Sequence, residues 1–125
     1  MKLLLVENYQ DLSGVIFNFF ENKGYSLDHA CDGLQGFTLA SQNHYDLIIL
    51  DVILLYTDGF SLCQKLRQQG IDTPVLMLAE RDIREEILEG YDMGADDYLV
   101  KPVDLEILEA RTKAMLRRRK TLLQV

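Results

Sequence analysis

The sequence predicts a single α/β domain in which five parallel strands alternate with five helices. Two observations carry this prediction. Short segments rich in Leu, Ile and Val alternate with longer segments whose apolar residues recur at helical spacing. The length of 125 residues suits one domain with a core of its own. Because strand–helix–strand crossovers are right-handed, consecutive strands become parallel neighbours in one doubly wound sheet with helices on both faces.

Five segments are expected to form the strands. The strand-like residues lie at 2–6, 25–30, 45–51, 74–78 and 97–100. The third and fourth contain "LIIL" and "VLML", which lack any polar alternation. A continuous apolar run is typical of a strand buried on both faces. These two segments are therefore expected to be central strands.

The intervening segments are expected to form helices. In the first, which starts near Asp11 and ends at Gly24, one apolar stripe is formed by Leu12, Val15, Ile16, Phe19 and Phe20. The others are expected at 34–42, 60–69, 83–92 and 104–120. Asp58-Gly59 opens the third helix and Gly70 ends it. We expect the domain to cover residues 1–120, and residues 121–125 to begin a linker.

Composition excludes several functional classes. Hydrophobic residues make up 48% of the chain and charged residues 26%, as in ordinary globular domains. Cys31 and Cys63 lie in no metal-binding spacing, which favours reduced thiols. A formal net charge of -7 argues against binding of a nucleic-acid backbone by this domain. The apolar run after Met1-Lys2 is too short for a signal peptide, and no apolar stretch approaches the length needed to cross a membrane, so we expect a cytoplasmic protein without a membrane partner.

Polar residues follow four of the predicted strands. They are Glu7-Asn8, Asp51, Glu80 after Ala79, and Lys101 before Pro102. In open parallel sheets, ligands bind beyond the carboxyl ends of the strands. An isolated acid after a strand is usually a turn or cap residue, but two acids and a lysine at one edge favour a site for a divalent cation and a phosphoryl group.

Several motifs together resemble a known family. They are "LLLVEN", "YDLIILD", "DGFSLCQKLR", "TPVLML" and "GADDYLVKP", and they span nearly the whole chain. The sequence resembles the receiver domain of two-component response regulators, and its last motif, with "EARTKAMLRR", is most similar to the OmpR/PhoB branch of transcription factors. The resemblance implies a flavodoxin-like fold with strand order 2-1-3-4-5 and a regulatory domain rather than an enzyme.

The resemblance also implies roles for the polar residues. Asp51 would accept a phosphoryl group from a sensor histidine kinase, and Lys101 would bind a phosphoryl oxygen. Mg²⁺ would be held by Glu7, Asn8, Asp51 and the backbone carbonyl of Ile53. The Lys101-Pro102 bond would be cis, which only proline makes inexpensive. Tyr98 matches the aromatic residue that turns inward when the family is activated.

Three positions depart from the family pattern. Asn8 replaces an Asp that ligates the metal, Ala79 replaces a Thr or Ser, and Leu55 replaces a Pro. An amide removes one charge from the cation site, so we expect weak or absent Mg²⁺ dependence. Ala79 lacks the hydroxyl through which phosphorylation would reach Tyr98, so switch coupling should weaken and an active-like resting state becomes a hypothesis.

The resemblance further implies a homodimer through the fourth helix, fifth strand and fifth helix. Two inter-subunit ion pairs would be formed by Asp96, Asp97, Arg111 and Arg118. A third pair, usually charged, is replaced here by Ile87 and Ile107. The alternative is that these isoleucines pack internally or lie scattered on the surface. Any DNA contact would come from a separate output domain after residue 125.

Two functional alternatives and one residue stay open. The first alternative is an ordinary phosphorylation-dependent receiver that tolerates Asn8. A flavodoxin-like cofactor protein or an aspartyl-phosphate hydrolase is disfavoured, because "ENYQDLSG" is no phosphate loop and Ile53 stands where such hydrolases carry a second acid. Glu80 either restores lost charge near the metal or repels phosphodonors, and the sequence does not decide between them.

Overall fold

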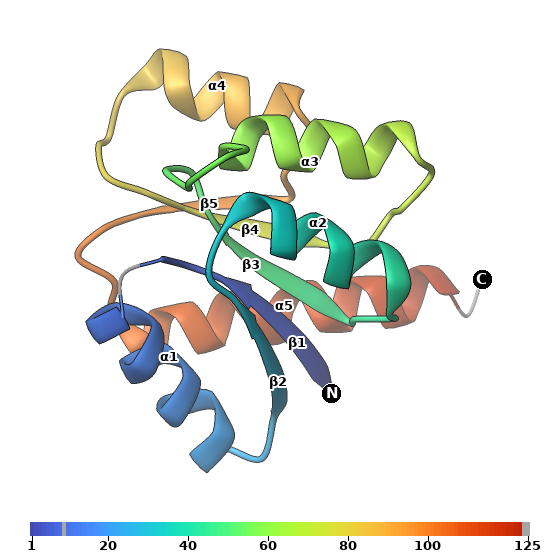
Figure 1. Ribbon diagram of the computed structural model, residues 1–125. Coiled ribbons are helices and arrows are strands. Elements are labelled where there is room, and N and C mark those ends of the chain that lie inside the picture. The colour runs from blue at the N-terminus through green and yellow to red at the C-terminus, as the bar shows by residue number, and fades with distance from the viewer. Residues whose placement is uncertain (9, 124–125) are drawn as a thin grey trace.

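A computed structural model describes residues 1–8 and 10–123 of the chain. It contains one parallel sheet with the strand order β2-β1-β3-β4-β5, as predicted (Figure 1). The strands are β1 (Lys2–Val6), β2 (Ser26–Ala30), β3 (Leu47–Asp51), β4 (Val75–Ala79) and β5 (Asp97–Val100). All residues of β3 and β4 are buried, which confirms them as central strands.

Helices cover both faces of the sheet. They are α1 (Gln10–Asn22), α2 (Gly33–Gln42), α3 (Gly59–Gln68), α4 (Arg84–Asp92) and α5 (Leu105–Leu123). Figure 1 shows α1 and α5 on one face and α2, α3 and α4 on the other. This is the doubly wound arrangement that right-handed crossovers produce.

Two apolar cores lie on the two faces because alternate strand residues point in opposite directions. Leu4 and Val6 of β1 pack towards α2 and α3, in the core that contains Leu62 and Leu66. Leu3 and Leu5 of β1 pack towards α1 and α5. The core on this side also contains Ile16, Phe20, Leu108, Met115 and Leu116. Each core fixes one layer of helices on the sheet.

Element boundaries differ from the predicted ones by one or two residues in most cases. The largest difference is at the end of α5, which continues through Leu123 instead of ending at 120. The linker predicted for 121–125 therefore overlaps the last turn of this helix, and residues 124–125 lie outside the described residues. Within the part of the chain that the structure describes, no helix is both long and apolar enough to cross a membrane.

Two apolar helix residues are exposed. Val15 belongs to the predicted apolar stripe of the first helix but does not face the core, since it is 52% exposed, and Leu34 in α2 is 54% exposed. In α1, Ile16 and Phe20 pack against the sheet. The apolar stripe of this helix is wider than the area that the sheet covers, so a residue at its border stays exposed. In α2 small residues, Gly36 and Ala40, make the close approach to the core.

Candidate functional site

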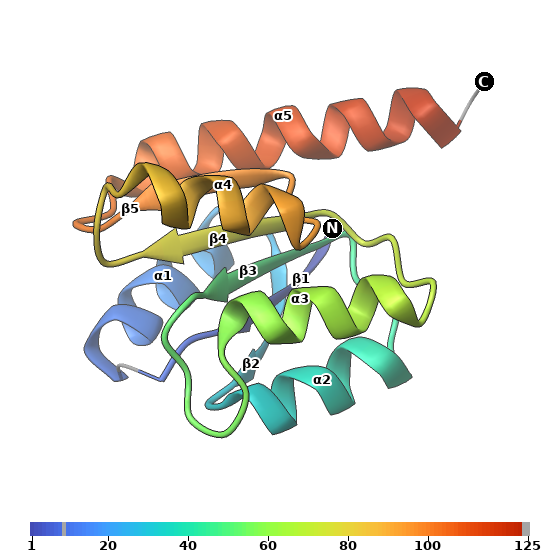
Figure 2. The same ribbon diagram turned by 90° about the horizontal axis from the view of Figure 1, so that it is seen from above.

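The carboxyl ends of the strands lie at one edge of the molecule, where the arrowheads of β3 and β4 point in the same direction (Figure 2). Glu7 follows β1, Asp51 ends β3, and Lys101 follows β5. The ammonium nitrogen Nζ of Lys101 lies 2.7 Å from Asp51 Oδ2 and 3.4 Å from Glu7 Oε2. The predicted meeting of two acids and a lysine at this edge is therefore what the structure contains.

These three groups form a buried charge cluster. Glu7 and Asp51 are fully buried, and only 12% of the Lys101 side chain is exposed. A buried carboxylate is costly unless a positive charge and hydrogen bonds compensate it. Burial by itself lowers the pKa of Lys101, but hydrogen bonds with Asp51 and Glu80 outweigh burial and raise that pKa above its usual value. Lys101 is thus the positive counter-ion of the cluster.

A third carboxylate reaches the same ammonium group. Glu80, the first residue after β4, places Oε1 at 3.0 Å from Lys101 Nζ. Its side chain is 40% exposed, in contrast to the two buried acids. The sequence left the role of Glu80 open because its contact with Lys101 depends on how the β4–α4 and β5–α5 connections approach each other.

Several backbone contacts hold the acids in place. The backbone N–H of Ile53 donates to Asp51 Oδ1 at 3.1 Å, and His29 Nε2 lies 2.8 Å from the Glu7 carbonyl oxygen. Gly59 starts α3 directly behind Asp51, where a Cβ atom would collide with the Asp51 carbonyl group. Glycine is therefore required for the close approach of α3 to the strand end.

The oxygen donors at this edge fit a hard divalent cation. Asn8 Oδ1 is a buried atom with no hydrogen-bond partner among the described residues. Asn8 directly follows Glu7 in the chain, at the end of β1. Mg²⁺ is commonly held by one or two carboxylates, other oxygen donors and water. Within residues 1–8 and 10–123, no three His, Cys, Asp or Glu side chains form a metal cluster, so such an ion would rely on two carboxylates and the amide.

The predicted switch residues also lie close to the core. Ala79 is buried at the end of β4, and Tyr98 in β5 is only 8% exposed. The Tyr98 hydroxyl is buried without a hydrogen-bond partner in the described part of the chain, and burial raises its pKa, with Glu86 and Asp82 adding to the effect. The side chain of Tyr98 therefore points inward in this structure.

Gly90 in α4 lies close to the inward Tyr98 side chain. A Cβ atom at position 90 would lie 3.1 Å from the Tyr98 ring and 3.3 Å from Met77 Sδ. Sequence reasoning did not single out Gly90. The available signal was a glycine inside the helical pattern "REEILEGYD", which usually has a packing reason.

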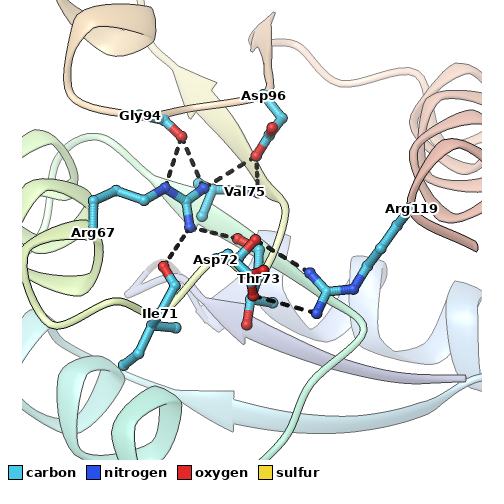
Figure 3. A network of polar contacts seen from close by, with 8 residues as sticks. All are labelled: Arg67, Ile71, Asp72, Thr73, Val75, Gly94, Asp96 and Arg119. Atoms are coloured by element: carbon cyan, nitrogen blue, oxygen red, sulfur yellow. Dashed lines mark hydrogen bonds and ion pairs between the residues drawn. The ribbon is translucent and has the colours of Figure 1, made fainter. Parts of the chain in front are cut away.

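Several residues of the expected dimer face have partners inside the chain. Arg111 Nη1 lies 3.0 Å from Asp97 Oδ1, and Arg67 Nη2 lies 3.1 Å from Asp96 Oδ2 (Figure 3). Arg118 is exposed. Ile87 packs partly against the core, whereas Ile107 is 48% exposed. Arg67, which sequence reasoning missed, thus competes for one of the acids expected to bind a second subunit.

Two local predictions at the site are confirmed. The Lys101-Pro102 peptide bond is cis. Asp58 caps α3, because its Oδ1 accepts a hydrogen bond of 2.9 Å from the backbone N–H of Ser61. Asp58 therefore has a structural role as a helix cap, in contrast to the buried Asp51 of the candidate site.

Comparison with known proteins identifies the family. The family model for the response regulator receiver domain matches residues 3–113. The chain belongs to this family. The transcriptional regulatory protein RprY of Bacteroides fragilis is 38% identical over 118 residues, which are 94% of this chain and 50% of that protein. The DNA-binding dual master transcriptional regulator RpaA of Synechocystis is 41% identical over 119 residues, which are 94% of this chain and 49% of that protein.

Solved structures agree with the family. The receiver domain of the Francisella response regulator 1452 has a TM-score of 0.91 and 36% identity, and the match covers 94% of this chain and 98% of that one. Receiver domains are a standard example of the 2-1-3-4-5 strand order. The chain is a receiver domain of a two-component response regulator, with transcriptional regulators among its relatives, and it spans about half the length of those relatives.

Proposed function

We propose that this receiver domain accepts a phosphoryl group on Asp51 from a sensor histidine kinase in the cytoplasm. The observation that carries the proposal is the buried Asp51 carboxylate, held 2.7 Å from Lys101 Nζ at the carboxyl edge of the sheet. An Asp51 oxygen would attack phosphorus, the bond from phosphorus to the kinase histidine nitrogen would break, and that nitrogen would keep the electron pair. Lys101 would then bind one phosphoryl oxygen.

Mg²⁺ would be held by Glu7, Asn8, Asp51 and the backbone carbonyl of Ile53, and when bound it would offset the negative charge of the phosphoryl group. The free amide oxygen of Asn8 supports this ligand set. An amide supplies an oxygen dipole but no net charge, and affinity for such cations follows the number of charged ligands. We therefore expect weaker Mg²⁺ binding than an Asp at position 8 would give.

The second part of the proposal is weak coupling between Asp51 and Tyr98. Ala79 offers a phosphoryl group no hydroxyl, and a ligand shifts a conformational equilibrium only through contacts that differ between its states. The inward Tyr98 side chain supports an active-like resting state that does not wait for phosphorylation. Signal transmission should be affected more than the phosphorylation step.

Labelling by a small phosphodonor tests the proposal. The protein is treated with acetyl phosphate with and without Mg²⁺, and the added phosphoryl mass is measured on the intact chain. We expect slow labelling with little Mg²⁺ response, faster Mg²⁺-dependent labelling in Asn8→Asp, and none in Asp51→Asn. Labelling that persists in Asp51→Asn would contradict the assignment of the acceptor.

An ordinary receiver that tolerates Asn8 is the second candidate, favoured by the complete pair Asp51 and Lys101. A beryllofluoride titration against Mg²⁺ distinguishes the two. Saturation of the wild-type chain at the Mg²⁺ concentration that saturates Asn8→Asp would support the ordinary receiver.

The coupling between the site and Tyr98 is tested with Ala79→Thr. This substitution should make the environment of Tyr98 respond to beryllofluoride, and an equal response in the wild-type chain would count against weak coupling.

We further propose a homodimer through α4, β5 and α5, with DNA contact left to a separate output domain. Exposed apolar side chains on the two helices support it, namely Leu88, Tyr91 and Ile107. Since Asp96 and Asp97 already have partners inside the chain, the apolar contacts would contribute more than the ion pairs with Arg118 and Arg111. Ile107→Glu should shift sedimentation towards monomer, and an unchanged dimer fraction would contradict this interface.

A further inference from the structure

Glu80 binds the residue that the phosphoryl group would need. The Lys101 ammonium has three N–H donors. Two of them face Asp51 Oδ2 at 2.7 Å and Glu80 Oε1 at 3.0 Å, and Glu7 Oε2 lies 3.4 Å away. Three carboxylates thus surround one positive charge. A phosphoryl oxygen that binds Lys101 has to compete with one of them.

The three carboxylates differ in how readily they can leave Lys101. Asp51 is the acceptor itself, and Glu7 is fully buried, so that water cannot solvate the Glu7 carboxylate if it moves away from Lys101. The Glu80 side chain is 40% exposed, and water can solvate its carboxylate after it moves away. Glu80 is therefore the partner of Lys101 that exchanges at the lowest cost.

We propose that Glu80 is a gate for anions at this site: its carboxylate holds Lys101 and opposes entry of a phosphoryl-sized anion until it is displaced. Glu80 acts through Lys101, so it is a positioning residue. The inference rests on the proposed role of Asp51 as phosphoacceptor, and it resolves the two readings of Glu80 in favour of repulsion of phosphodonors.

The charge of the cluster supports this direction. Glu7, Asp51 and Glu80 contribute -3 and Lys101 contributes +1, which gives a net charge of -2. Acetyl phosphate also carries negative charge and has to approach the exposed side of the cluster, where Glu80 lies. Neutralising Glu80 removes one unit of repulsion and frees one N–H of Lys101.

The experiment compares Glu80→Gln with the wild-type chain and with Glu85→Gln. Glu85 is an exposed acid in the first turn of α4, so its substitution changes the net charge of the protein by the same amount. Asp51 labelling by acetyl phosphate is followed by intact mass at saturating Mg²⁺, and repeated in an Asn8→Asp background so that the metal does not limit the rate. We expect Glu80→Gln to be labelled about two- to fivefold faster, as suits a partly exposed ion pair, and Glu85→Gln at the wild-type rate.

Ionic strength provides a readout that a merely structural role would not move. The advantage of Glu80→Gln should shrink in high salt, because salt screens charges near the surface. Equal labelling of Glu80→Gln and wild type, equal acceleration in Glu85→Gln, or slower labelling of Glu80→Gln would each overturn the gate while leaving Asp51 as the acceptor. Absence of labelling in every variant, Asn8→Asp included, would instead refute the proposed function and the gate with it.

Discussion

Tyr98 has a hydroxyl group whose burial has an energetic consequence. The hydroxyl has no hydrogen-bond partner among the described residues, and a buried polar group without one costs about 1–3 kcal/mol. We expect Tyr98→Phe to leave the free energy of unfolding unchanged or to raise it by about 1 kcal/mol, because phenylalanine fills the same space without that cost. Urea unfolding followed by circular dichroism measures the difference.

Tyr45 supplies the matched control for this substitution. Its hydroxyl donates a hydrogen bond of 2.7 Å to Asp28 Oδ2. Tyr45→Phe should therefore destabilise the domain by about 1 kcal/mol. A charge-assisted hydrogen bond can contribute more than this, but the partial exposure of Asp28 reduces its contribution. If Tyr98→Phe were as destabilising as Tyr45→Phe, the Tyr98 hydroxyl would have a partner in solution and the inward state would differ from the one described.

At the scale of elements, Arg67 connects three parts of the fold. Its guanidinium group donates to the carbonyl oxygens of Gly94, Ile71 and Thr73 at distances of 2.8–3.1 Å and to Asp96 Oδ2 at 3.1 Å (Figure 3). The end of α3 is thereby tied to the α3–β4 connection and to the turn that leads from α4 to β5. The planar guanidinium group presents five N–H donors in a fixed fork, two more than a lysine ammonium, which suits it to several acceptors in one plane.

This network predicts that removal of the Arg67 side chain has a large effect on the stability of the domain. Arg67→Ala should lower the free energy of unfolding by about 2–3 kcal/mol, since several partly buried carbonyl groups lose a charged donor. Arg119→Ala is the control, because Arg119 contacts Asp72, whose side chain is 85% exposed, through an ion pair of 3.5 Å that should contribute less than about 0.5 kcal/mol. Equal losses in the two variants, measured by urea unfolding, would contradict the role given to Arg67.

The packing of α4 on β5 gives a prediction for the switch. Gly90→Ala adds a methyl group 3.1 Å from the Tyr98 ring, so the ring has to move outward or α4 has to shift. We expect larger exposure of Tyr98, seen as changed ring resonances in NMR spectra, and a stability gain smaller than the roughly 1 kcal/mol that alanine normally gives in a helix.

Gly14 in α1 is the matched position for this test. Among the described residues, no atom outside the backbone of α1 and the two chain neighbours lies within 4 Å of a Cβ built there, so Gly14→Ala should show the full gain from helix propensity and leave Tyr98 unchanged. Identical stability gains at positions 14 and 90, with unmoved Tyr98 resonances, would show that Gly90 has no part in holding the ring inward.

At the scale of the whole molecule, the sequence predicted what depends on patterns along the chain. Strand order, helix layers and the approach of Asp51 to Lys101 follow from periodicity, crossover handedness and the family resemblance. It could not predict the contacts of Arg67 or Glu80, because each joins residues brought together by the packing of separate connections. Val15 was misplaced for a related reason: helical periodicity defines a stripe but not how much of it the sheet covers.

The charge cluster at the strand ends links the stability of the domain to its proposed chemistry. Glu7 and Asp51 are fully buried, and Lys101 compensates both of them. Lys101→Met should lower the free energy of unfolding by about 3 kcal/mol, because it removes the positive charge that both buried carboxylates contact. Urea unfolding of the wild-type and Lys101→Met chains measures the loss.

Two changes, added Mg²⁺ and a second substitution, should recover part of the stability that Lys101→Met loses. At the proposed site Mg²⁺ would bind the folded acids and not the unfolded chain, so it should stabilise Lys101→Met, and more strongly when Asn8→Asp adds a charged ligand. Asp51→Asn should also stabilise Lys101→Met, because it removes the charge of one of the two buried carboxylates. If neither addition raised the stability of Lys101→Met, repulsion between the strand-end acids would not be the cause of its instability, and the proposed cation site would lose its electrostatic basis.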